Sequence, residues 1–240
     1  MDSTSQILLV IAIIFLSTFT RSALGFGDAL IAMPLLAMIV GITTATPLVA
    51  MAASTIAITI LSRAWRDVNV KAAWRLVLSS LVGIPIGLYF LKTAPESIVK
   101  MVLGIVLIGF GLYNLIAPKL PHLRNEKLAF LFGFGAGILG GAYNANGPLV
   151  VVYSALRKWS PGNFRATLQG YFFPTGFTVL ISHGLAGLWT PRVLRLYLYA
   201  LPVILVGVII GEIVNRRFSV ERFYNIVYVV LILMGILLFL

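Results

Sequence analysis

Long apolar runs recur along the whole chain, separated by short polar stretches. They lie at about 7–24, 29–40, 46–62, 73–92 and 96–117, and then at about 127–141, 147–157, 164–182, 193–214 and 219–240. A helix needs roughly 20 apolar residues to cross a bilayer, so the runs at 29–40 and 147–157 are too short to span it comfortably alone. The pattern predicts an all-α polytopic membrane protein in which 1–240 form a single transmembrane domain.

Both short runs follow a glycine-rich break, and the second break, at 133–148, is the more unusual. Glycine costs a helix roughly 1 kcal/mol relative to alanine and proline about 3, so we expect the backbone to leave the helix at Gly140-Gly141 and Gly147-Pro148. Irregular backbone at membrane depth needs protein or a water-filled cavity to satisfy its polar groups. This break is therefore a candidate binding site. An alternative stays open for its first half, because glycines spaced by four also let helices pack closely.

The two sets of runs match each other at an offset of 114 residues. Phe26-Gly27 then falls on Gly140-Gly141, and Met33-Pro34 falls on Gly147-Pro148. An internal duplication explains such a match and predicts one repeat at 5–118 and a second at 124–240.

Basic residues discriminate between two topologies, because Lys and Arg collect on the cytoplasmic side. If each broken region crosses the membrane once, the chain has eight spans, and the basic residues other than Arg21 divide nine against eight. If each broken region is a re-entrant hairpin, the second repeat is inverted and the division is thirteen against four. We therefore expect two inverted repeats, each a re-entrant hairpin plus three transmembrane helices (about eight membrane segments by conventional count), with both termini outside.

Arg21 and Asp28 flank Gly25 and Gly27 in the first break and are its only opposite charges. An ionisable group inside the membrane costs at least ~2.5–3.5 kcal/mol, so each is a functional candidate. Two structural roles are alternatives to a functional one. Asp28 could be the N-cap of a half-helix that begins at Ala29, and Arg21 could form an ion pair with Asp28.

The second break offers Asn144, Asn146 and Gly147, and the two asparagines suit caps as well as amide contacts to a ligand. Half-helices starting near Ala29 and Leu149 would point their positive N-terminal ends into the gap between the breaks. That arrangement favours an anion.

The helix after the second break begins with Arg165 and Gln169, and Arg165 is equally consistent with a cytoplasmic anchor. His183 is expected in a loop or at the membrane interface. The candidate substrate-binding residues are Arg21, Gly25, Gly27, Asp28, Asn144, Asn146, Gly147, Arg165 and Gln169.

Composition narrows the function. The chain is 60% hydrophobic and has no cysteine and two distant histidines, so we expect no metal and no cofactor. The net charge of +11 fits a cytoplasmic membrane surface better than nucleic acid.

The expected partners are a small anion and the lipid bilayer, with a homo-oligomer possible. No nucleotide-binding Gly-x-x-x-x-Gly-Lys-[Ser/Thr] loop and no Gly-x-Ser-x-Gly or His-Glu-x-x-His motif is present. A secondary carrier is favoured over a channel and, further behind, over an intramembrane enzyme.

Several short motifs, in this order and spacing, resemble the sulfite exporter TauE/SafE family over nearly the whole chain. They are Gly25-Phe26-Gly27 with Pro34, the loop from Arg63 to Asn69 with Trp74, Gly137-x-x-Gly140-Gly141 leading to Asn146-Gly147-Pro148, and Phe164-Arg165-Ala166-Thr167. The resemblance implies transport of sulfite, an organosulfonate or a related carboxylate across the inner (cytoplasmic) membrane. This chain departs from the family pattern where Asp28 replaces a glycine and where Asn144 and Asn146 stand among expected glycines.

Overall fold

The computed structural model describes residues 3–64, 70–116, 123, 125–159, 161–217 and 221–239. Within these ranges the chain forms ten α-helices and no strand. The helices are α1 (Thr4–Leu24), α2 (Asp28–Val40), α3 (Ile42–Ala64), α4 (Val70–Thr93), α5 (Glu96–Ile116), α6 (Leu128–Tyr143), α7 (Gly147–Leu156), α8 (Pro161–Leu185), α9 (Pro191–Arg217) and α10 (Glu221–Leu237). Five of those described, α1, α3, α4, α5 and α9, are long and apolar enough to cross a membrane. The protein is thus an all-helical, multi-pass membrane protein, as the apolar runs predict.

Each half of the chain begins with a helix, a three-residue break and a short second helix. Gly25–Gly27 separate α1 from α2, and Asn144–Asn146 separate α6 from α7. Gly25 (φ 92°), Gly27 (φ 101°) and Asn144 (φ 54°) have positive φ, a conformation that glycine adopts freely and asparagine tolerates best among the other residues. The expected break at Gly140-Gly141 is wrong, because α6 continues to Tyr143 and Gly147 already begins α7.

The offset of 114 between the halves is also wrong. α2 begins at Asp28 and α7 at Gly147, 119 residues later, and the starts of α3 and α8 differ by the same 119. The sequence match had paired Pro34 with Pro148, but Pro34 lies inside α2 whereas Pro148 lies in the first turn of α7. The sequence comparison therefore aligned two prolines that occupy different positions in their helices.

Glycines on α6 are used for close helix packing. A Cβ added at Gly133, Gly137 or Gly141 would overlap Ser79, Ser80 or Ile84 of α4 respectively. On α4, Gly83 and Gly87 meet the α6 backbone in the same way. The small-xxx-small alternative is thus confirmed for the first half of the 133–148 run.

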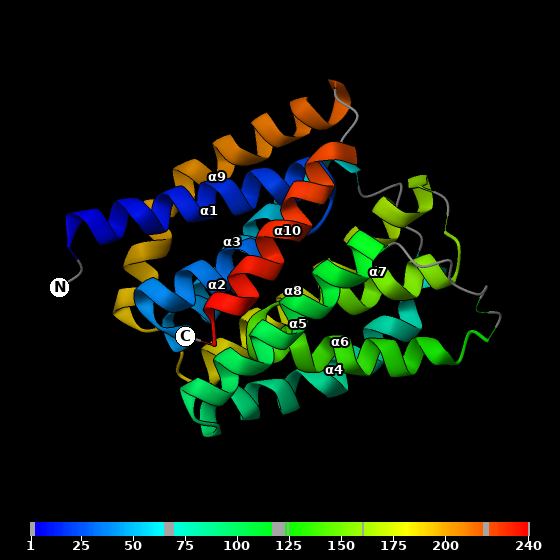
Figure 1. The fold of residues 1–240 in the computed structure, drawn as a ribbon, viewed down its shortest axis with the longest axis horizontal. Coiled ribbons are helices and arrows are strands. Elements are labelled where there is room, and N and C mark those ends of the chain that lie inside the picture. The colour runs from blue at the N-terminus through cyan, green and yellow to red at the C-terminus, as the bar shows by residue number, and fades with distance from the viewer. Residues whose placement is uncertain are drawn as a thin grey trace.

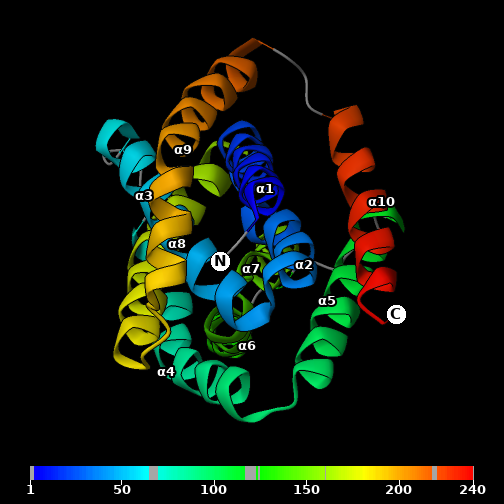
Figure 2. The same ribbon diagram turned by 90° about the vertical axis from the view of Figure 1, so that its left-hand side faces the viewer.

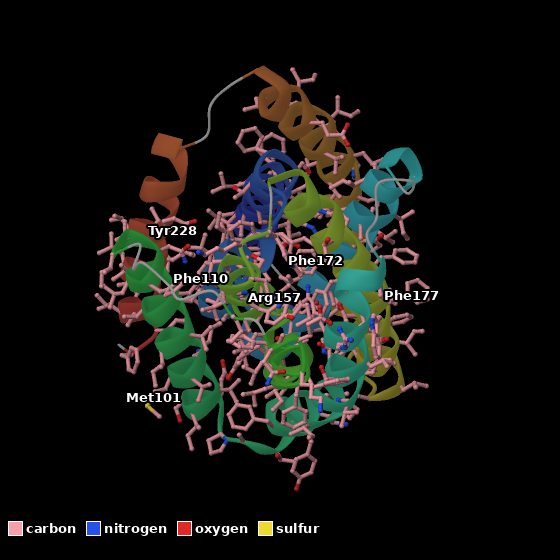
Figure 3. The ribbon with its side chains drawn as sticks, turned by 90° about the vertical axis from the view of Figure 1, so that its right-hand side faces the viewer. Met101, Phe110, Arg157, Phe172, Phe177 and Tyr228 are labelled. Atoms are coloured by element: carbon pink, nitrogen blue, oxygen red, sulfur yellow. The ribbon has the colours of Figure 1, made fainter. Side chains whose placement is uncertain are left out.

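The second half of the chain packs in a corresponding way. α9 lies along α1, as α4 lies along α6, with Gly207 and Gly211 against Thr18 and Ser22. α5 and α10 pack against each other and form a pair at one side of the molecule (Figure 2). This pair contacts the break between α1 and α2 through Phe26. The centroid of the Phe26 ring lies 6.2 Å from that of Phe110 on α5, and the Phe110 ring also contacts the Tyr228 ring of α10 (Figure 3).

α1 and α2 form one hairpin, and α6 and α7 form another. Gln6 Nε2 donates to the Ile39 carbonyl at 2.7 Å, so the start of α1 lies beside the end of α2. In the same way Leu123 N donates to the Leu156 carbonyl at 2.9 Å, just before α6 and at the end of α7. The N-terminus lies at the left of Figure 1 and the start of α6 at the right, so the hairpins point toward each other.

Candidate functional site

A pocket lies where the tips of the two hairpins meet. The first tip contributes Gly27 to Leu30, and the second contributes Asn144 to Pro148. Arg21 of α1, Ala53 of α3, and Phe172 and Gly176 of α8 complete the wall. The volume open to the centre of a water-sized sphere is about 20 Å³, where one water needs roughly 10–15 Å³. In this conformation the pocket therefore has room for one or two water molecules.

Both short helices begin at this pocket. The N-cap residues, Gly27 of α2 and Asn146 of α7, make no side-chain cap bond to their helices. The first N–H groups of a helix have no partner within it and carry the positive end of the helix dipole. Two such ends at one pocket give it a positive potential and suit an anion.

Arg21 and Asp28 form an ion pair on the pocket wall. Arg21 Nη1 lies 2.7 Å from Asp28 Oδ2, and the two side chains are 4% and 13% exposed. The guanidinium lies over the Phe172 ring, 5.0 Å from its centroid. In the described part of the chain, Arg21 Nε and Nη2 are buried without a hydrogen-bond partner. Asp28 thus compensates part of the positive charge of Arg21. The N-cap of α2 is Gly27 and not Asp28.

The two asparagines of the second tip have different roles. Asn146 Nδ2 donates to Thr175 Oγ1 of α8 at 3.2 Å, and Thr175 Oγ1 donates to the Tyr171 carbonyl at 2.7 Å. Asn144 ends α6 with its backbone, since its N–H donates to the Gly140 carbonyl at 2.8 Å. The Asn146 amide is therefore held in place on the pocket wall by α8, and does not act as a side-chain cap.

The carbonyl groups at the C-terminal end of a helix have no hydrogen-bond donor within that helix. At both hairpin tips, side chains of neighbouring helices donate to them. Gln169 Nε2 of α8 donates to the Gly25 carbonyl at 3.3 Å, which fixes the first tip. At the second tip, His183 Nε2 pairs with the Gly141 carbonyl at 3.1 Å, and Thr46 Oγ1 is 3.5 Å from the Ala142 carbonyl. The expectation of a loop or interface histidine is wrong: His183 is fully buried, because this carbonyl needs a donor that α6 no longer supplies.

The structure brings most of the predicted site residues together. Six lie on the pocket wall: Arg21, Gly27, Asp28, Asn144, Asn146 and Gly147. Gly25 and Gln169 are bonded to each other beside the first tip. Arg165 lies on α8, but its side chain is outside the described residues.

Sequence reasoning missed the α3 and α8 part of the wall. Ala53 and Phe172 are separated by the same 119 residues as the starts of α2 and α7. The offset of 119 would have placed these two residues at equivalent positions of the two halves.

Discontinuous helices that meet at a buried polar pocket are a feature of many membrane transporters. The family model described as sulfite exporter TauE/SafE matches residues 10–238. The chain belongs to this family of membrane transporters, as the motif resemblance indicates. No curated protein and no solved structure matches it.

Proposed function

We propose that the protein is a secondary transporter that moves a small anion, sulfite or an organosulfonate or related carboxylate, across the inner (cytoplasmic) membrane. The observation that carries this proposal is the buried Arg21, with two unpaired nitrogens, on a pocket where two helix N-termini meet. A buried charge with unpaired donors is costly, and an anion is the ligand that satisfies it.

The arrangement of the halves supports alternating access. The two hairpins begin at opposite ends of the molecule (Figure 1), their tips line one pocket, and α4–α6 and α1–α9 are corresponding contacts. Inverted repeats of this kind let one bundle rock against the other around a central site. We therefore propose that the halves are inverted repeats and that the hairpins are re-entrant.

Counterflow in liposomes tests the proposal. Liposomes containing the purified protein and unlabelled sulfite are diluted into trace ³⁵S-sulfite, and a carrier should accumulate label transiently above equilibrium. Protein-free liposomes give the background. Uptake that neither saturates nor overshoots would indicate a channel, and consumption of sulfite without transport would indicate an enzyme. Absence of any sulfite or sulfonate movement contradicts the proposal.

A further inference from the structure

Three neighbouring residues on α1 carry buried polar atoms without a partner. In the described chain these atoms are Thr18 Oγ1, Arg21 Nε and Nη2, and Ser22 Oγ. Thr18, Arg21 and Ser22 are 0%, 3% and 2% exposed, so water does not reach them. Their spacing of three and four residues puts all three on one face of the helix.

Two other hydroxyls on the same stretch of α1 behave in the usual way. Ser17 Oγ donates to the Ile14 carbonyl at 3.0 Å, and Thr20 Oγ1 donates to the Leu16 carbonyl at 2.8 Å. Such bonds to the preceding turn are the normal outcome for Ser and Thr in a buried helix. The hydroxyl groups of Thr18 and Ser22 form no such hydrogen bond to the preceding turn. In this stretch of α1 the hydroxyls without a partner belong to Thr18, three residues before Arg21, and to Ser22, directly after it.

The geometry of Arg21 leaves one particular edge free. Asp28 occupies Nη1, and Phe172 covers a face of the guanidinium. Nε and Nη2 together form a fork of parallel donors, which matches two oxygens bound to the same atom. A spherical halide has one acceptor centre for the two donors and therefore matches the fork less closely.

We propose that Thr18 and Ser22 bind the transported anion together with the Nε/Nη2 edge of Arg21, and that this site selects oxyanions over halides. The inference rests on the proposed function and adds two binding residues to it. Asp28 is a positioning residue, because it holds Nη1 and so presents the opposite edge. Together the edge and the two hydroxyls offer four donors, which suits the three oxygens of sulfite or a sulfonate.

The site is occluded in this conformation. Gly207 and Gly211 of α9 pack directly against Thr18 and Ser22, and neither hydroxyl residue lies on the wall of the central pocket. Under this proposal, an anion reaches the two hydroxyls only after α1 separates from α9.

Paired substitutions test the proposal with controls from the same helix. Thr18→Val and Ser22→Ala remove the unpaired hydroxyls, whereas Thr20→Val and Ser17→Ala remove hydroxyls bonded within α1. The dissociation constants of sulfite and methanesulfonate are measured by calorimetry on the purified protein in detergent. Thr18→Val and Ser22→Ala should each weaken binding about tenfold, the cost of one hydrogen bond to a charged ligand, while the controls stay within about twofold.

Further variants and probes separate binding from folding. Thr18→Ser and Ser22→Thr keep a hydroxyl and should restore affinity even where the first pair lowers Tm. Equal shifts in test and control variants, or no shift in either, would overturn the role of Thr18 and Ser22. Chloride binding as tight as that of sulfite would overturn the oxyanion selectivity. If the unmodified protein binds neither oxyanion, the proposed function itself fails, and this inference fails with it.

Discussion

Arg21 carries a positive charge where almost no solvent reaches it, and Asp28 compensates only one of its nitrogens. Asn146 is neutral and is held by Thr175. These residues stand out in the sequence because charges and amides are expensive within apolar runs. Phe172 does not stand out, because an aromatic residue in an apolar helix has the same appearance whether it faces lipid, protein or a pocket.

Asn146→Ala should weaken anion binding by roughly 10- to 150-fold, because loss of a hydrogen bond to a charged ligand costs ~1.5–3 kcal/mol. Thermal-shift titration with sulfite measures the affinity, and the transition without ligand reports folding. Thr175→Val is the matched control, since it frees the Asn146 amide without removing it and should have a smaller effect. If alanine at Arg21, Asn144 and Asn146 leaves affinity unchanged in all three variants, the site lies elsewhere.

Asp28 is predicted to act as a structural and electrostatic partner of Arg21 and not as a proton carrier. The carboxylate accepts a hydrogen bond from Arg21 Nη1 at 2.7 Å and lies in the first turn of α2. Export of an anion is already driven by about 2.3 kcal/mol per charge per 100 mV, so it needs no coupled proton. Transport by the wild type and by Asp28→Asn is compared with and without an imposed pH gradient. A response to the gradient in the wild type that disappears in a variant still able to exchange would identify Asp28 as the carrier.

The helices follow the apolar runs closely, and the discrepancies have physical reasons. The run at 147–157 corresponds to α7, and the run at 7–24 to α1. The end of α6 could not be predicted from helix propensity, because Gly141 packs against Ile84 of α4 and Gly140 packs against Asn146, and these contacts offset the intrinsic cost of glycine in a helix. The break falls instead at Asn144, which tolerates a positive φ. His183 was misplaced because its partner, the Gly141 carbonyl, becomes available only once α6 ends there.

Gly87→Ala should destabilise the protein by about 1–3 kcal/mol, because a Cβ there overlaps the Ile138 carbonyl and forces α4 away from α6. Gly109→Ala on α5 is the control, since its Cβ meets nothing within 4 Å. The control should be neutral or slightly stabilising, as alanine is the better helix former. Thermal unfolding of both variants in the same detergent makes the comparison. Equal transition temperatures would contradict the close α4–α6 contact.

Charged contacts mark the two ends of the molecule. Arg75 and Arg157 both pair with Glu126 at the end where α6 begins. At the other end, Lys92 donates to the Ala186 carbonyl and Lys100 pairs with Glu96. These placements agree with the division of basic residues that the sequence suggests.

The thirteen residues assigned to the cytoplasmic side are Arg63, Arg66, Lys71, Arg75, Lys119, Arg124, Lys127, Arg157, Lys158, Arg165, Arg216, Arg217 and Arg222. Of these, Arg66, Lys119 and Arg124 lie outside the described residues, as do the side chains of Arg63, Lys71, Arg165, Arg216, Arg217 and Arg222.

Single cysteines in this cysteine-free chain test the orientation. Ser3 lies before α1, Ser62 near the end of α3 and Ser97 at the start of α5, and all three side chains are exposed. If the first hairpin is re-entrant, α3 carries the chain from the outer side to the cytoplasm. An impermeant maleimide added to intact cells should then label Ser3→Cys and Ser97→Cys but not Ser62→Cys. Ser62→Cys should react only after the membrane is opened, which shows that its thiol is competent. If the broken region is one crossing, Ser3 and Ser62 share a side, and labelling of both from the same side would contradict the re-entrant hairpin.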